Sequence, residues 1–423
     1  MHLNSISKTF ILFFILQLTK GAAQDTLNSA SVEQKSYQLY LDKNWPELIK
    51  YGNTAVKNGV DYFYLEMRIG IAYYERKNYC LAEGYFKKAL KYNSNDASAQ
   101  EYLYYCYIFT GRFEAARMFS KQFGEELAKK TGTNTLSKIG FVMVEGGSKK
   151  TDSTSYYDRV KKTNTNYFDN ATYYQFGINH YIKNSTSVFH ALTYFKQKSF
   201  LGTNRQLQYY LKFSIPLKKD WLISPAIQLI NTKNSNTLTS PSNAMPPSGM
   251  RPPPKSGTVV SRSNSFVGSL EIQKNIKKIS LSVGTTVSNM DSTIQFNHNG
   301  TLAYSILGNS RLIIGCRAYI HTSNSYSTTY TSYSPYIYIQ PSKRISITTS
   351  YLSNVGNNII EENGYLVNNS PDLTTSRWSA LASLNVNKHI SLYGLYQMEN
   401  KKESVQLFNY NYHVIVVGLK FVP

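Results

Sequence analysis

The C-terminal two-thirds of the chain alternates between apolar and polar residues, and this pattern restricts the fold more than any other feature. From Leu207 onward, segments of about ten residues place an apolar side chain at every second position. In the segment 207–217, the odd positions hold Leu, Tyr, Leu, Phe, Ile and Leu, and the even positions are mostly polar. A period of two sends successive side chains to opposite faces of a strand. One face then suits lipid and the other a wet interior, which predicts a transmembrane β-barrel.

Composition and length are consistent with a barrel joined to a second region. Charged residues make up 17% of the chain and aromatic residues 14%, with 36 Tyr, whereas soluble domains carry about 25% charged residues. An excess of tyrosine is typical of the aromatic girdles at the two interfaces of a membrane. A chain of 423 residues is longer than one ordinary domain needs, so we expect two regions.

The formal net charge of +21 raises the question of an anionic partner. Lys and Arg are scattered through both regions, without the Arg-rich run or the aromatic and basic module of a nucleic-acid binder. We therefore expect no nucleic-acid partner. Anionic glycans, lipopolysaccharide or an acidic protein are better matches for the positive electrostatic field of scattered Lys and Arg.

The N-terminal residues 1–23 have the features of a secretory signal peptide. Lys8 precedes the apolar run 10–18, and Gly21, Ala22 and Ala23 supply the small residues of a cleavage site. The apolar run is shorter than the roughly 20 residues that span a bilayer as a helix, and no later segment reaches that length. An exported chain with alternating strands is expected in a bacterial outer membrane, in contact with its lipid.

Between residues 24 and 130 the apolar period becomes that of helices, and the segment repeats at a spacing of 34 residues. The clearest unit runs from Phe63 to Asp96, and a weaker copy precedes it around Trp45 and Ala55. The recurring small and apolar residues are Ile69, Gly70, Tyr73, Tyr79, Ala82, Phe86, Ala89 and Leu90, followed by Leu103, Tyr107, Gly111, Phe113 and Ala116. They resemble the tetratricopeptide repeat, in which small residues let two antiparallel helices approach and aromatic residues fill the groove. We expect an α-helical solenoid of three units, followed by a linker at 131–136.

The concave face of such a solenoid usually binds a peptide or protein. Tyr73 and Tyr107 occupy packing positions and are expected in the core. The surplus tyrosines are either further packing residues or candidates for binding a periplasmic protein partner, and they are Tyr62, Tyr64, Tyr74, Tyr102, Tyr104 and Tyr105.

Residues 137–423 are expected to form an antiparallel transmembrane barrel of about fourteen strands, with twelve as the alternative. The weakest strand is the first, because Gly146 and Gly147 interrupt it. Short turns and long breaks alternate between the strands, which puts the short turns, both ends of the barrel and the helical repeats on the periplasmic side. The candidate strands are 137–146, 171–181, 188–198, 205–217, 221–231, 263–273, 279–289, 296–307, 311–321, 332–340, 345–354, 376–386, 390–398 and 408–421.

Alternation also assigns the two faces of each strand. On the last strand, Ile415, Val417, Leu419 and Phe421 are expected to face lipid. The charged residues expected to line the lumen are Lys212, Glu271, Arg311, Arg317, Arg377 and Lys420. Such a mostly basic lining favours the passage of anions. Alternatively, these side chains pair with one another and with loop carboxylates, and thereby brace or plug the lumen.

Motifs of catalytic or cofactor sites are absent from the sequence. No HExxH, Walker A or GxSxG motif occurs, so we expect no enzyme activity, catalytic residue or cofactor. Cys80, Cys106 and Cys316 are too sparse for a zinc site or a disulfide scaffold, so we expect no metal; Cys80 and Cys106 either pair or remain buried thiols. An outer-membrane hydrolase remains an alternative that needs a Ser and a His within hydrogen-bond reach, and the scattered histidines are His180, His190, His298, His321, His389 and His413.

Together, the repeat residues and the alternating strands resemble bacterial proteins in which periplasmic tetratricopeptide repeats precede an outer-membrane barrel. Examples are exopolysaccharide exporters of the cellulose and poly-N-acetylglucosamine type and the smaller YaiO-like barrels of Bacteroidota. The resemblance implies repeats that recruit a periplasmic partner and a barrel that conducts or displays a polymer, possibly an anionic polysaccharide. The competing hypothesis is an occluded barrel with a structural or assembly role and no transport.

Overall fold

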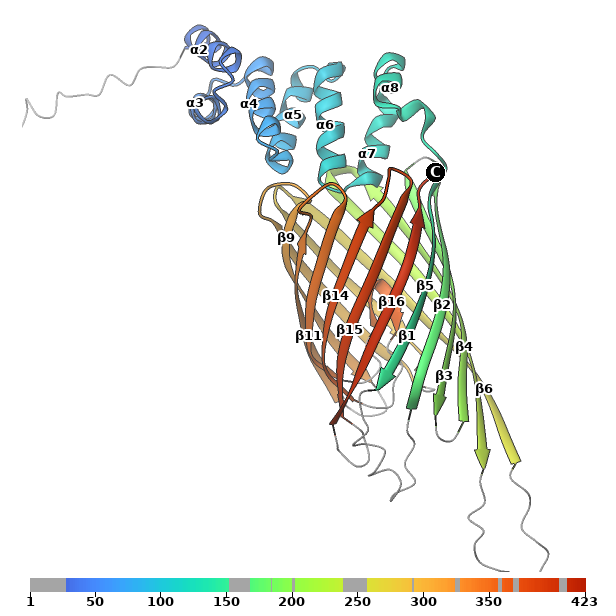
Figure 1. Ribbon diagram of the computed structural model, residues 1–423. Coiled ribbons are helices and arrows are strands. Elements are labelled where there is room, and N and C mark those ends of the chain that lie inside the picture. Colours follow the sequence, from blue (N-terminus) through green and yellow to red (C-terminus); the bar gives the residue numbers. More distant parts are fainter. Residues whose placement is uncertain are drawn as a thin grey trace, which may run out of the picture.

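The computed structural model describes residues 28–151, 168–183, 185–199, 202–238, 257–290, 293–323, 328–356, 360–367, 373–402 and 409–423. An array of helices lies across one end of a β-barrel (Figure 1). The expected signal peptide, and part of the long break expected between the strands at 221–231 and 263–273, lie outside these residues. None of the described helices is both long enough and apolar enough to cross a membrane.

The helical domain repeats with the period expected from the sequence. The helix starts at Ser29, Phe63 and Ala97 are 34 residues apart, and so are those at Trp45, Tyr79 and Phe113. The helices are α2 (Ser29–Leu41), α3 (Trp45–Lys57), α4 (Phe63–Glu75), α5 (Tyr79–Tyr92), α6 (Ala97–Phe109), α7 (Phe113–Phe119) and α8 (Glu125–Thr131), with short 3-10 turns η1 (Ser120–Gln122) and η2 (Thr133–Thr135). The expected linker 131–136 thus holds the end of α8 and η2.

Small residues allow the helices to pack closely. Gly70 of α4 lies against the Phe86 ring of α5, where an added Cβ would stand 2.7 Å from a ring carbon. Ala82 and Ala89 are fully buried beside Phe86. Cys80 and Cys106 are free, buried thiols, which decides between the two readings of the sequence.

Fourteen strands form a single closed antiparallel barrel, in agreement with the expected fold class. Each expected strand is present, and most run several residues further. They are β1 (Ile139–Thr151), β2 (Phe168–Ile182), β3 (Thr186–Ser199), β4 (Gly202–Leu217), β5 (Trp221–Leu238), β6 (Gly257–Ile276), β7 (Ile279–Ser288), β8 (Gln295–Ser305), β9 (Leu312–Ser323), β10 (Thr328–Ile339), β11 (Ile345–Gly356), β14 (Leu373–Asn385), β15 (Ile390–Lys402) and β16 (Asn409–Phe421).

The first strand is longer than expected and closes the ring. β1 pairs with β16 from Val142 opposite Phe421 to Thr151 opposite Tyr412, so the glycines do not interrupt it. Position 147 requires glycine, because a Cβ there would stand 2.2 Å from a carbon of the Tyr173 ring. The expected interruption was wrong because Gly147 makes room for the inward Tyr173 ring within a continuous strand.

The outer wall of the barrel is apolar. Ile415 and Val417 of β16 are 58% and 63% exposed, whereas Val416 between them is 3% exposed. The same alternation exposes Ile279, Leu281 and Val283 on β7. Because large apolar side chains cover the outside of a closed sheet, the outer surface suits an apolar solvent.

The helical domain contacts turns that are widely separated around the barrel. Lys121 Nζ donates to Ser185 Oγ, which lies in the turn between β2 and β3. Ser310 N, in the turn between β8 and β9, donates to Phe109 O of α6. These two turns are six strands apart in a ring of fourteen, so they lie on nearly opposite sides. The segment from α5 to α7 therefore bridges this end of the barrel, which we call the near end (Figure 1).

Candidate functional site

The lumen is occupied by a short hairpin that enters from the opposite, far end of the barrel. It consists of β12 (Ile360–Glu361), the 3-10 turn η5 (Glu362–Gly364) and β13 (Leu366–Val367), and it connects β11 to β14. Gly364 has φ of 85° and Asn363 of 59°, which suits the tight reversal at its tip. We call residues 360–367 the lumen hairpin.

Two ion pairs hold the acidic side of the lumen hairpin. Glu361 pairs with Arg377 of β14, and both side chains are at least nine-tenths buried. Glu362 pairs with Arg317 of β9 at 3.1 Å between Oε1 and Nη2. Arg317 and Arg377, both predicted to line the lumen, therefore lie in it, and both meet loop carboxylates.

Hydrogen bonds fix the tip on the opposite wall. Asn363 Nδ2 donates to Ser224 O of β5 at 2.8 Å. The Asn363 carbonyl accepts from Tyr210 Oη of β4 at 3.2 Å and from Ser269 Oγ of β6 at 2.7 Å. Asn297 of β8 donates to Ile360 O. Because these partners stand on strands all around the ring, the lumen hairpin crosses the lumen rather than lying along one side.

Ring contacts complete the plug. Tyr365 packs edge to face on Tyr210, with 5.1 Å between ring centroids, and on Phe189, with 5.9 Å. Gln175 donates a hydrogen bond to Tyr365 Oη. The hairpin thus joins the wall through apolar, polar and ionic contacts.

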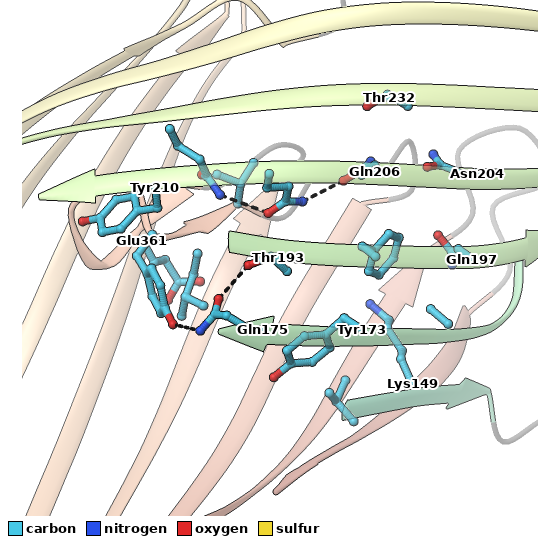
Figure 2. A pocket seen from close by; sticks show the side chains of 18 of the residues that line it. Lys149, Tyr173, Gln175, Thr193, Gln197, Asn204, Gln206, Tyr210, Thr232 and Glu361 are labelled. Carbon is cyan, nitrogen blue, oxygen red and sulfur yellow. Dashed lines mark hydrogen bonds between the residues drawn. The ribbon is translucent and has the colours of Figure 1, made fainter. Parts of the chain in front are cut away.

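Beyond the hairpin, toward the far end, the lumen keeps a cavity of about 500 Å³ (Figure 2). Side-chain amides dominate one wall, and Figure 2 shows Gln206, Asn204, Gln197 and Gln175 around the space. The other lining residues include Lys149, Tyr173, Phe195, Gln208, Gln228, Thr232, Glu361, Arg377, Glu399 and Tyr412.

The ionic groups of this cavity pair within the wall. Lys149 Nζ lies 2.7 Å from Glu399 Oε2, which joins β1 to β15 across the closing seam. Glu145 accepts hydrogen bonds from Tyr393 at 2.6 Å and from Gln175 at 3.2 Å. For Arg317 and Arg377, the structure therefore agrees with the second possibility raised by the sequence, in which inward charges pair with loop carboxylates.

The remaining charged candidates lie in different places. Lys212 and Glu271 are on the inward positions of β4 and β6, where Asn299 donates to Glu271. Lys420 faces inward with its ammonium 4.1 Å from the Phe141 ring centroid. Arg311 was wrongly assigned to a strand: it precedes β9 in a turn that Asn309 holds by accepting a hydrogen bond from Arg311 N.

A cluster of four charged side chains fastens the helical domain to the near end. Asp220, in the 3-10 turn η3 (Lys218–Asp220) between β4 and β5, accepts from Lys87 at 2.6 Å and from Arg112 at 3.4 Å. Lys87 and Arg112 also pair with Glu83. We call Glu83, Lys87, Arg112 and Asp220 the near-end charge cluster. Burial opposes the charged form of Glu83, but Arg112 and Lys87 outweigh it and hold the pKa of Glu83 below its usual value.

Most tyrosines proposed to bind a partner pack within the helical domain. Tyr74, Tyr102 and Tyr105 are half-buried in an aromatic cluster, in which Tyr102 stacks on Phe86. Tyr62 packs against the first helices. Tyr104 is only 6% exposed, so the prediction that it offers a binding surface was wrong. Tyr64 alone of the six is mostly exposed, at 62%.

In the described part of the chain, the hydrogen bonds of His180, His190, His389 and His413 go to partners other than serine. His180 and His190 lie on the outer wall 3.1 Å apart, and His190 contacts Tyr209 Oη at 2.7 Å. His413 contacts Tyr396 Oη at 2.8 Å. Among the described residues, no three His, Cys, Asp or Glu side chains gather as a metal site would require.

Several solved structures are distantly similar to the chain. A Pseudomonas aeruginosa FadL homologue matches 68% of this chain and 91% of its own, with 10% identity and a TM-score of 0.39. The Pseudomonas putida toluene transporter TodX matches 66% and 89%, with 10% identity and a TM-score of 0.41. MamA MSR-1 matches 25% and 59%, with 21% identity and a TM-score of 0.22. No substrate follows from similarities of this size. No family model and no curated protein matches the chain.

Sequence reasoning missed the lumen hairpin, although a local signal for it exists. Asn363-Gly364 lies between the apolar pairs Ile359-Ile360 and Leu366-Val367, and Asn-Gly is the strongest short-range mark of a hairpin turn. The two carboxylates before it are rare negative charges in a strongly basic chain. The hairpin lies in the long break between the strands predicted at 345–354 and 376–386, where the alternation of the sequence predicts no strand.

Proposed function

We propose that the chain is a non-enzymatic outer-membrane protein whose barrel is a channel, closed in the present state by the lumen hairpin. The exposed apolar side chains of the outer wall support insertion into a bilayer, because they would otherwise lie in water. The expected signal peptide would direct the chain to that membrane.

The proposed orientation places the near end in the periplasm. The turns between β4 and β5 and between β6 and β7 are short and lie at the near end, as do both ends of the barrel. Bacterial barrels keep their short turns on the periplasmic side. The helical domain would then lie in the periplasm, and the lumen hairpin would enter from outside the cell.

One observation carries the channel proposal: the lumen is closed by a separate hairpin instead of by the wall itself. Its ion pair between Glu362 and Arg317 is partly exposed, with side chains 47% and 28% accessible, so it contributes little stability. The pair between Glu361 and Arg377 is buried and is costly to break on one side. Because β12 and β13 pair only with each other among the described strands, the plug can leave the lumen without breaking the strand pairing of the barrel.

The cargo and the partner belong to the same proposal. Export of a polysaccharide, implied by the sequence resemblance, requires that the lumen hairpin first leave the lumen, because it contacts the wall from β2 to β14. The helical repeats, which bridge the periplasmic opening, are placed to hold a partner where cargo would enter or leave. Tyr64 is the exposed aromatic residue through which we expect such a partner to bind.

Single-channel recording in planar bilayers tests the channel. We expect the parent protein to be mostly silent and the double variant Glu361→Gln, Glu362→Gln to show frequent open events, because it removes both carboxylates that anchor the hairpin. Glu125→Gln is the matched control, since Glu125 is an exposed residue of the helical domain. Silence of the folded double variant would favour the occluded structural barrel instead.

A covalent tether sharpens this test. A Cβ added at Gly364 would stand 3.8 Å from the Ser269 Cβ, which matches the separation in a disulfide. In the double variant that lacks both carboxylates, adding Ser269→Cys and Gly364→Cys should keep the channel closed until a reductant is added. The left-handed backbone at Gly364 will cost about 1–2 kcal/mol for a cysteine, which the folded barrel can tolerate.

A further inference from the structure

We propose that the far-end cavity binds a neutral oligosaccharide. This inference rests on the proposed function, because the cavity faces the cell exterior only if the barrel has the orientation given above. It adds a specific binding site, and a preference for neutral sugars, to the polysaccharide cargo of that proposal.

The amide wall of the cavity is arranged to bind hydroxyl groups. Gln208 Nε2 donates to Gln206 Oε1 at 2.8 Å, and Gln228 Nε2 donates to Gln208 Oε1 at 3.0 Å (Figure 2). The donors of this row are thus oriented, while acceptors remain. Gln228 Oε1 and Asn204 Oδ1 are buried and have no hydrogen-bond partner among the described residues. A buried acceptor without a donor costs free energy, which a ligand hydroxyl would recover.

The charges of the cavity argue for a neutral ligand. Lys149 is paired with Glu399, and Arg377 with Glu361, so neither cation is left to attract an anion. Glu145 is bound by tyrosine and glutamine donors. Because these charges are paired or hydrogen-bonded with groups of the wall and of the lumen hairpin, an anionic or cationic ligand would gain little and would lose its hydration.

The shape and the aromatic residues suit sugar rings. Tyr173 and Phe195 line the same space as the amides and offer flat apolar faces. Sugars present one apolar face and a rim of hydroxyl groups, which matches a wall of aromatic rings and amides. A volume of about 500 Å³ lies within the usual range of small-ligand sites, about 300–1,000 Å³.

Isothermal titration calorimetry on the full-length protein in detergent micelles tests the site. The probes are three neutral trisaccharides, namely cellotriose, maltotriose and triacetylchitotriose, with trigalacturonate as the anionic counterpart. We expect at least one neutral probe to bind, and Gln228→Ala and Asn204→Ala each to weaken it about three- to tenfold, the effect of one lost hydrogen bond. Gln273→Ala is the matched control, because Gln273 faces the lumen near the periplasmic end and does not line the cavity.

The outcomes separate the two proposals. The binding site is overturned if no neutral probe binds, if trigalacturonate binds better, or if all three variants bind alike while heat-modifiable gel mobility shows them folded. Hairpin-release currents without sugar binding would reject the binding site alone. Sugar binding to a barrel that stays silent in every hairpin variant would reject the channel and support the binding site.

Discussion

At the scale of single residues, strained backbone supports the attachment of the helical domain. Lys219 and Asp220 both adopt left-handed conformations, with φ of 59° and 62°. Such conformations cost free energy in residues other than glycine. At Asp220 this cost is offset by the near-end charge cluster, because the turn aims the carboxylate at Lys87 and Arg112.

Asp220→Asn should loosen the helical domain from the barrel. The change leaves Lys87 and Arg112 with one carboxylate, that of Glu83. Because the members of the cluster are about one-third exposed or less, we expect the free energy of docking between the helical domain and the barrel to weaken by about 3 kcal/mol. Hydrogen exchange should accelerate in α7 and in the turn between β2 and β3. Glu125→Gln removes an exposed pair with Lys129 and should leave exchange unchanged. Equal exchange in Asp220→Asn and the parent protein would argue against this attachment.

Glu66 should make the helical domain less stable as the pH rises. Burial raises the pKa of Glu66 from 4.5 to about 7, against the opposing effect of Lys88, whose Nζ lies 2.9 Å away. The folded state then holds a proton that the unfolded state releases, so stability falls between about pH 4.5 and pH 7. Urea denaturation followed by helical circular dichroism should show a loss on the order of 2 kcal/mol across this range.

Glu66→Gln is the test of that assignment, because it cannot lose a proton. At about pH 8, the variant should keep most of the free energy of unfolding that it has at about pH 4.5. Glu83 provides the contrast: its pKa is lowered, so its contribution is full above the unfolded value and is lost as the pH falls through the folded one. An unchanged pH dependence in Glu66→Gln would assign the effect to another group.

At the scale of secondary-structure elements, two glycines of the helical domain have opposite roles. Gly70 faces the Phe86 ring at a distance that excludes a methyl group, whereas nothing lies within 4 Å of the Cβ position at Gly84. Gly70→Ala should destabilise the domain by about 1–3 kcal/mol through overpacking. Gly84→Ala should stabilise it by about 0.5–1 kcal/mol, because alanine favours helix. Thermal denaturation of the two variants should shift in opposite directions; a shift of the same sign would contradict the packing of α4 on α5.

Elements with regular patterns were predictable from the sequence, and elements defined by their partners were not. The strands follow from an apolar period of two residues and the repeated helices from a repeat of 34 residues. Both patterns are visible in neighbouring residues of the sequence. The lumen hairpin depends on Arg317 and Arg377, which lie on other strands, so its inward path could not be read from residues 360–367 alone. Arg311 was misplaced for a similar reason, since an Asn309 side chain decides where the turn ends.

At the scale of the whole molecule, closure depends on the pairing of the first and last strands. The Tyr173 ring covers Gly147 on the inner wall, whereas Gly146 faces outward with its Cβ position 3.4 Å from Tyr174. Gly147→Ala should therefore lower the thermal stability of the barrel more than Gly146→Ala does. Heat-modifiable electrophoretic mobility gives the unfolding temperature of each variant. Equal temperatures would show that the ring can move aside at no cost.

The faces of the barrel were predictable because closure makes alternation obligatory, but the character of its interior was not. Counting inward residues suggested a basic lumen, but the structure pairs two of those cations, Arg317 and Arg377, with carboxylates of the lumen hairpin. Only a three-dimensional arrangement shows that Lys149 meets Glu399 at the closing seam. The candidate cavity therefore emerged from the structure alone.

The bridge from α5 to α7 has a consequence for biogenesis. Its landing points, in the turns on either side of the opening, are separated by a distance that the circumference of the finished ring determines. A barrel that lacked a strand, or whose strands were paired in the wrong register, would hold these two turns at a different distance. We expect the helices to dock only on correctly closed barrels, so that docking distinguishes correctly assembled molecules from misassembled ones.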